Sequence, residues 1–124
     1  LCKGAYLEPR EAALPKKSEV DVNYRALMGR LLEAGREPAL ATHDEKILRE
    51  ALELIKSGRV KADGGVEFQM LYGIRRDLQE SLLKEGFNVR IYVTYGGEWY
   101  SYLMRRMAER PANLLFVARN LFRG

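Results

Sequence analysis

The stretch VEFQMLYGIRRDLQESLLKEGFNVRIYV, residues 66–93, carries the strongest signal for the fold class. Apolar and polar residues alternate along Val66–Leu71, which is typical of a strand whose two faces meet different surroundings. A helix is predicted over Ile74–Glu85 with a stop at Gly86, and Val89–Val93 is predicted as the next strand. A strand, a helix and a strand joined by short turns indicate a parallel βαβ unit.

The same alternation of strand and helix extends on both sides of this unit. Upstream, Leu1–Tyr6 and Pro38–Thr42 are predicted strands. Downstream, helices are predicted over Glu98–Glu109 and Ala112–Phe122, separated by Pro111. The chain is therefore predicted to be an α/β protein of four βα units, which make either a small open sheet or half of an eight-stranded barrel.

Two upstream helices are predicted from their caps and from the spacing of their apolar residues. Asp21 is a candidate N-cap for a helix that ends at Gly35. Thr42 or Asp44 can cap a second helix, which ends at Gly58. The apolar stripes at helical spacing are Val22, Leu27, Met28, Leu31 and Leu32 in the first helix, and Ile47, Leu48, Ala51, Leu52 and Ile55 in the second.

Composition and charge narrow the class of protein. The chain has 124 residues, 47% of them hydrophobic and 31% charged, which suits one globular domain and excludes collagen-like, disordered and disulfide-rich classes. The net charge of +4 lies in the last twenty residues, because residues 1–104 carry 16 basic and 16 acidic side chains. So local an excess argues against nucleic-acid binding and leaves open a single-anion site or a solvated basic helix end.

The single cysteine and the single histidine limit the chemistry of the chain. Cys2 cannot form an internal disulfide, and we predict it to be a small buried core residue of the first strand. One histidine, His43, excludes a site with several histidine ligands, and no metal is predicted. Because His43 follows a predicted strand, a ligand role and a capping or hydrogen-bonding role are both open.

The carboxyl ends of the predicted strands carry polar and aromatic residues. Ligands of parallel sheets bind at these ends, so we expect a rim suited to a planar aromatic cofactor or a small polar substrate. The strand ends are Lys3-Gly4-Ala5-Tyr6, Thr42-His43-Asp44, Gln69-Met70-Leu71-Tyr72-Gly73 and Tyr92-Val93-Thr94-Tyr95-Gly96.

Two groups of basic residues are candidate anion sites. Tyr102, Arg105 and Arg106 share one face of a predicted helix, and two guanidinium groups beside a phenol suit a carboxylate. The alternative is a surface helix with ordinary ion pairs. Lys16 and Lys17 precede a predicted helix start and could hold phosphate, although such a pair taken alone is usually solvated.

Six motifs follow one another along the chain, and Pro111-Ala112-Asn113 followed by Phe116-Val117 continues the series. They are Lys3-Gly4-Ala5-Tyr6, Asp21-Val22-Asn23-Tyr24, Ala41-Thr42-His43-Asp44, Glu67-Phe68-Gln69-Met70-Leu71-Tyr72-Gly73, Arg90-Ile91-Tyr92-Val93 and Tyr102-Leu103-Met104-Arg105-Arg106. Together they resemble the C-terminal half of the proline dehydrogenase family over essentially all 124 residues. The resemblance implies a (βα)8 TIM barrel with FAD at the carboxyl rim, to which residues 1–124 contribute strands five to eight and a C-terminal helix.

The resemblance also implies roles for individual residues. Residues expected to hold FAD are Lys3, Gly4, Ala5, Lys17, Thr42, His43 and Gln69. Residues expected to bind proline are Arg105 and Arg106 at its carboxylate, and Tyr6, Tyr92 and Tyr102 around its ring. Glu109 matches a family glutamate without an assigned role. No catalytic residue is assigned within the chain, because the family's catalytic residues are expected before Leu1.

The implied activity is the oxidation of L-proline to Δ1-pyrroline-5-carboxylate, with electrons passed through the flavin to a membrane quinone. The implied setting is the prokaryotic cytoplasm with peripheral contact to the inner membrane. Four strands cannot close an eight-stranded barrel, so the chain is expected to be a fragment, inactive without an N-terminal half. The alternative is another βα-barrel enzyme that binds a phosphorylated small molecule through Lys16, Lys17 and the arginines.

Overall fold

The structure is a computed structural model that describes residues 1–3, 9–60 and 65–101. Helices and strands alternate along these residues in the order α1 (Lys17–Ala34), β1 (Ala39–Ala41), α2 (Glu45–Lys56), β2 (Glu67–Leu71), α3 (Arg76–Lys84) and β3 (Asn88–Tyr92). The α/β class is therefore confirmed. Residues 99–101 are helical, while residues 102–109 of the predicted helix Glu98–Glu109 and all of Ala112–Phe122 lie outside the described residues. Among the described helices, none has the length and apolar character needed to cross a lipid bilayer.

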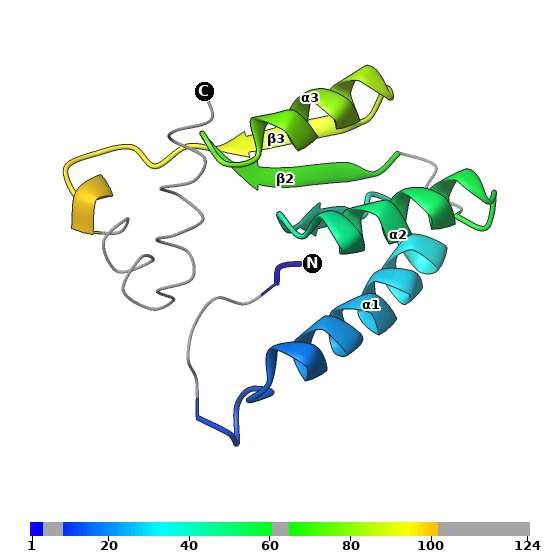
Figure 1. Ribbon diagram of the computed structural model, residues 1–124, viewed down its shortest axis with the longest axis horizontal. Coiled ribbons are helices and arrows are strands. Elements are labelled where there is room, and N and C mark those ends of the chain that lie inside the picture. The colour runs from blue at the N-terminus through cyan, green and yellow to red at the C-terminus, as the bar shows by residue number, and fades with distance from the viewer. Residues whose placement is uncertain (4–8, 61–64, 102–124) are drawn as a thin grey trace.

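The three strands form one parallel sheet in the order β1-β2-β3 (Figure 1). At the free edge of β1, Cys2 makes a single parallel bridge to Ala41. The backbone N–H of Lys3 donates to the carbonyl of Ala41 at 3.2 Å, and the N–H of Ala41 donates to the carbonyl of Leu1 at 2.8 Å. Of the predicted first strand, the described residues show this bridge alone, so four complete βα units are not established.

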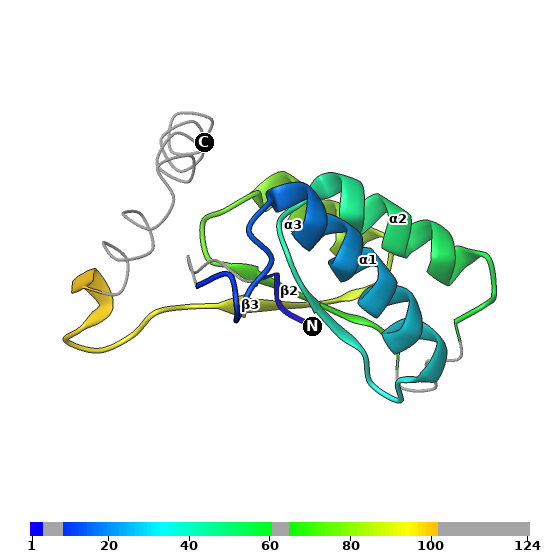
Figure 2. The same ribbon diagram turned by 90° about the horizontal axis from the view of Figure 1, so that it is seen from below.

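Helices α1, α2 and α3 all pack on one face of the sheet (Figure 2). Leu40, Phe68 and Met70 point into this layer and are at most 2% exposed. Phe68 also meets the ring of Phe87 edge to face, with 5.4 Å between the ring centres. Because buried residues alternate with half-buried ones along β2, the predicted alternation of Val66–Leu71 is confirmed.

The opposite face carries none of the three described helices, and we call it the helix-free face. Glu67, Gln69 and Arg90 lie on it, since they alternate with the buried residues of β2 and with the half-buried residues of β3. Cys2 lies there too, because its bridge partner Ala41 is in register with Gln69. Cys2 is exposed, so its predicted place in the core is wrong; its neighbour Leu1 packs against the core instead.

The predicted N-cap of the first helix is also wrong. α1 begins at Lys17, four residues before Asp21. The N–H of Lys16 donates to a carboxylate oxygen of Glu19 at 3.4 Å, which is the reciprocal half of a capping box and stabilises the earlier start. Asp21 thus lies inside the helix, where two lysines rather than backbone amides bind its carboxylate.

The buried face of α1 differs from the predicted stripe. Met28 and Leu32 are buried as expected, but Val22 is 66% exposed and Leu27 41% exposed. Tyr24 is 3% exposed and takes the position in the core, and its hydroxyl donates to the carbonyl of Leu1 at 3.2 Å. The amphipathic ring of a tyrosine can therefore replace an aliphatic residue in the buried stripe.

The remaining helices agree more closely with prediction. Asp44 is the N-cap of α2, and its carboxylate accepts from the N–H of Lys46 at 3.2 Å. The helix ends before Gly58, whose φ of +73° suits glycine. α3 begins two residues later than predicted, because Arg75 has a left-handed backbone with φ of +52° that cannot continue a helix.

Candidate functional site

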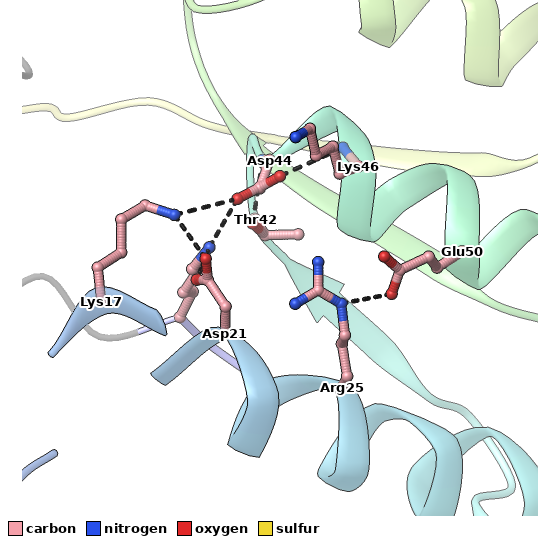
Figure 3. Close-up of polar contacts among 8 residues, drawn as sticks. Lys17, Asp21, Arg25, Thr42, Asp44, Lys46 and Glu50 are labelled. Carbon is pink, nitrogen blue, oxygen red and sulfur yellow. Dashed lines mark hydrogen bonds and ion pairs between the residues drawn. The ribbon is translucent and has the colours of Figure 1, made fainter. Parts of the chain in front are cut away.

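Four charged side chains meet at the carboxyl end of β1, between the first turns of α1 and α2. We call Lys3, Lys17, Asp21 and Asp44 the charge cluster (Figure 3). The ammonium of Lys3 lies 2.5 Å from an Asp21 oxygen and 2.8 Å from an Asp44 oxygen. The ammonium of Lys17 lies 2.6 Å from Asp21 and 3.7 Å from Asp44. The cluster ties the N-terminal segment to two helices that are adjacent in space.

Burial distinguishes the members of the charge cluster. The side chains of Lys3, Asp21 and Asp44 are 12%, 16% and 24% exposed, whereas that of Lys17 is 66% exposed. Burial raises the pKa of Asp21, but the hydrogen bonds and charges of Lys17 and Lys3 together outweigh it and hold this pKa below its ordinary value. Both carboxylates therefore stay ionised at neutral pH, and Lys17 is the cluster's one cation open to an incoming anion.

The pKa of Asp44 follows the same balance. Burial raises it, but the hydrogen bond and charge of Lys3, the backbone hydrogen bond from Ile47 and the charge of Lys17 together hold it below its ordinary value. For Lys17 the hydrogen bond to Asp21 raises the pKa above its usual value. The cluster thus combines two positive and two negative charges that neutralise one another.

Thr42 adds a hydroxyl group directly beside the charge cluster. It is 5% exposed, and its Oγ1 accepts a hydrogen bond from the N–H of Asp44 at 3.1 Å. A hydroxyl that accepts this bond still carries a proton to donate. Thr42 can therefore offer one O–H to a ligand at the end of β1.

His43 links the end of β1 to the end of β2. Its Nε2 accepts a hydrogen bond from the N–H of Leu71 at 2.9 Å. Burial, and after it the charge of Arg75, lowers the pKa of His43 below 6.5, so the ring is neutral at neutral pH. A neutral ring that accepts at Nε2 carries its proton on Nδ1. Of the two roles left open, hydrogen bonding is present at Nε2, and Nδ1 remains a donor.

This bond predicts a pH dependence of stability. Because the pKa of His43 is lower in the folded chain, the unfolded chain binds a proton first as pH falls below about 6.5. The free energy of unfolding should therefore fall as the pH drops through about 6.5 toward the lower pKa of the folded chain. In His43→Gln, whose amide oxygen can still accept from Leu71, urea unfolding should show a smaller fall; an equal fall in both proteins would contradict the assignment.

A second cluster of polar side chains, formed by Glu67, Gln69 and Arg90, lies on the helix-free face. Gln69 Nε2 donates to Glu67 Oε1 at 2.7 Å. Arg90 donates to both oxygens of Glu67, at 2.8 Å from Nε and 2.7 Å from Nη2. Tyr92 lies two residues beyond Arg90 on the same strand and is 54% exposed. This face therefore presents Gln69 in the middle of β2 and Tyr92 at the carboxyl end of β3, so Gln69 lies two residues before the strand end at which it was expected.

The predicted site residues thus fall into three sets. Lys3, Lys17 and Thr42 come together at the end of β1, with His43 beside them in sequence. Gln69 and Tyr92 lie on the helix-free face. The predicted residues that lie outside the described ones are Gly4, Ala5, Tyr6, Tyr102, Arg105, Arg106 and Glu109.

Asp21 and Asp44 were not predicted as partners of the lysines. A signal for one of them exists, because Lys17 and Asp21 stand four residues apart on a helix. Asp21 and Asp44 also line a groove of about 640 Å³ between α1 and α2. The other residues that line it are Lys17, Arg25, Glu45, Lys46 and Arg49. Within the described ranges, no group of three or more His, Cys, Asp or Glu side chains is placed to hold a metal ion.

Comparison with known proteins identifies the family. A family model described as proline dehydrogenase matches residues 1–119. The chain belongs to the proline dehydrogenase family. The resemblance inferred from its motifs is thereby confirmed.

Curated relatives carry the same description. The proline dehydrogenase of Deinococcus radiodurans is 48% identical over 124 residues, and proline dehydrogenase 2 of Bacillus subtilis strain 168 is 46% identical over 121 residues. These alignments cover 100% and 98% of this chain but only 40% of each relative. The carbapenem antibiotics biosynthesis protein CarD of Pectobacterium carotovorum subsp. carotovorum is 34% identical over 117 residues, which cover 86% of this chain and 30% of that protein. The chain spans about two fifths of the length of the two proline dehydrogenases.

Proposed function

We propose that this chain is the FAD-holding part of an enzyme that oxidises L-proline to Δ1-pyrroline-5-carboxylate. The match of the proline dehydrogenase family to residues 1–119 carries this proposal. The donors at the strand ends support it, because each of them can serve a dinucleotide cofactor bound at the carboxyl edge of a parallel sheet.

The proposed architecture is the second half of a (βα)8 barrel over residues 1–124. A barrel strand has helices on its outer face and the lumen on its inner face. An open doubly wound sheet has helices on both faces. The three described helices on a single face, opposite Glu67, Gln69 and Arg90, support the barrel. The N-terminal half of such a barrel would then be the chain's partner.

The donor set suits FAD. The exposed ammonium of Lys17, beside the groove between α1 and α2, suits a diphosphate. The hydroxyl of Thr42 and the Nδ1–H of His43 supply uncharged donors, and the amide of Gln69 suits the edge of a flavin ring. Lys3 is enclosed by two carboxylates and holds the cluster in place. Gly4 and Ala5 belong to the same proposed site through the motif that they share with Lys3.

The mechanism assigned to the chain is positioning. FAD, when bound, supplies the acceptor for the two electrons that leave the substrate. Arg105 and Arg106 are proposed to bind the proline carboxylate through paired N–H···O bonds. Tyr6, Tyr92 and Tyr102 are proposed to enclose the ring and keep water from it. The oxidation removes two electrons and two protons from the ring nitrogen and its neighbouring carbon, and proper orientation lowers the barrier to it.

The proposed electron acceptor beyond the flavin is a quinone. Quinones dissolve in membrane lipid, so the proposal includes a cytoplasmic enzyme with a peripheral contact to the inner membrane. A second candidate function is binding of a phosphorylated small molecule. The groove favours it by one positive charge, because four cations line it (Lys17, Arg25, Lys46 and Arg49) against three carboxylates (Asp21, Asp44 and Glu45).

The test uses the protein at its natural length. Proline should bleach the visible flavin band of the purified protein and reduce a dye acceptor. In Arg105→Ala the KM for proline should rise by about tenfold or more, because a charge-assisted pair is lost. Arg36→Ala, at an exposed position after α1, is the matched control and should leave KM unchanged. A protein without flavin that instead binds glucose 6-phosphate would replace this proposal with the second candidate.

A further inference from the structure

Glu67, Gln69 and Arg90 form a hydrogen-bonded network on the helix-free face. Gln69 and Arg90 are paired in the register of β2 and β3, and Glu67 is paired with Asn88. Arg90 therefore reaches diagonally across the strand pair to Glu67, which it grips through two parallel N–H···O bonds. The same carboxylate receives the amide of Gln69 from two residues along β2, at 2.7 Å. One carboxylate thus joins both side chains.

The ionised state of Glu67 decides how the amide of Gln69 is oriented. The hydrogen bonds from Arg90, followed by that from Gln69, lower the pKa of Glu67 to about 2. An ionised carboxylate only accepts hydrogen bonds. The NH2 of Gln69 must therefore face Glu67, and its carbonyl oxygen must face away from Glu67 as an acceptor.

We propose that Glu67 and Arg90 are positioning residues that fix Gln69 as a hydrogen-bond acceptor toward a bound ring. The inference rests on the proposed function, in which that ring is the isoalloxazine of FAD. The pyrimidine edge of oxidised isoalloxazine has one N–H donor, at N3, among several acceptors. A carbonyl oxygen selects N3–H, whereas an NH2 group in its place would meet the N3–H as a second donor. Glu67 thus sets which edge atom Gln69 recognises without touching the ring.

Glu67→Gln isolates this effect. The variant keeps the size of the side chain but offers an amide, against which Gln69 can turn in either sense. The matched control is Glu85→Gln, which removes the carboxylate of a comparable ion pair, with Lys56 at 2.7 Å. Glu85 is 33% exposed and lies just after α3, while Glu67 is 26% exposed. The two substitutions are therefore alike in chemistry and exposure.

The experiment measures the dissociation constants of FAD and of N3-methyl-FAD by flavin fluorescence, in the protein at its natural length. Wild type and Glu85→Gln should bind FAD about tenfold or more tightly than the methylated flavin, because the methyl group removes the donor and leaves the amide oxygen unpaired. In Glu67→Gln and in Gln69→Ala this ratio should fall toward about one. The ratio cancels any general loss of binding that a merely structural role would cause.

A second readout uses FAD labelled with nitrogen-15 at N3. Its N3–H signal should exchange more slowly with water in wild type than in Glu67→Gln. If wild type binds FAD but does not discriminate between the two flavins, or if Glu67→Gln retains the full ratio and slow exchange, the positioning role is overturned while the proposed function stands. Failure of wild type to bind FAD would overturn the proposed function, and this inference with it.

Discussion

Replacing Phe68 by alanine is expected to lower the free energy of unfolding by about 4 kcal/mol. Phe68 on β2 is 0% exposed and packs between the sheet and the helices. Truncation removes the transfer energy of the ring, leaves a cavity and breaks the edge-to-face contact with Phe87. A loss of this size is a large fraction of the roughly 5–15 kcal/mol by which a folded domain is typically stable.

Urea unfolding followed by circular dichroism measures this loss. Phe68→Leu keeps most of the volume and should cost only about 1.5 kcal/mol, so it gives a value even where the alanine variant is unfolded. Leu83→Ala is the surface control, because Leu83 is 57% exposed beside the buried Leu82, and should cost about 0.5 kcal/mol. A cost below about 1 kcal/mol for Phe68→Ala would show that β2 is not the centre of the core.

The spacing of apolar residues and the capping residue correctly predicted β2 and α2, because neighbouring residues in the sequence determine these two elements. The alternation of β2 and the cap and stripe of α2 depend on residues within a few positions, and the structure contains them as predicted. Asp21 was predicted wrongly as an N-cap because the capping box of Lys16 and Glu19 starts α1 four residues earlier, and Cys2 was predicted wrongly because a distant residue decides its face. Asp21 also forms an ion pair with Lys3, which lies in the N-terminal segment. The bridge to Ala41 determines on which face of the sheet Cys2 lies.

The candidate site shows the same division. Gln69 lies in the middle of β2 rather than at its end. The position of Thr42 directly after β1 followed from the order of strands and helices, since parallel strands end at one edge. The contacts that define their chemistry did not, because Asp44 and Glu67 bind partners from other elements. Periodicity reports which face a residue occupies but carries no information on which charge lies across from it. Residues of the predicted arginine clamp lie outside the described part of the chain.

The second large effect is expected at Lys3. Replacing it by methionine should lower the free energy of unfolding by about 3 kcal/mol, because breaking a largely buried ion pair leaves charges without compensation. Asp21 and Asp44 would then share the single ammonium of Lys17, which is 66% exposed. The pKa of each carboxyl should rise, because Lys3 contributes to the lowering of both.

Two further variants separate charge from packing. Asp44→Asn added to Lys3→Met removes one of the two opposed charges, while asparagine preserves the N-cap of α2. This double variant should be more stable than Lys3→Met alone. Lys56→Met is the control, because Lys56 is 63% exposed in its ion pair with Glu85, and it should cost about 0.5 kcal/mol.

The pH dependence of the free energy of unfolding distinguishes a charge effect of Lys3 from a packing effect. In wild type the lowered pKa values of Asp21 and Asp44 contribute stability above their ordinary values, and this contribution is lost as pH falls through the lowered ones. Lys3→Met lacks much of that contribution, so the difference between the two proteins should narrow toward about pH 3. Urea unfolding at neutral and acidic pH measures both. A difference that stays constant with pH, or a double variant no more stable than Lys3→Met, would mean that the lysine stem contributes packing alone and that the charge cluster does not hold the end of β1 to the two helices.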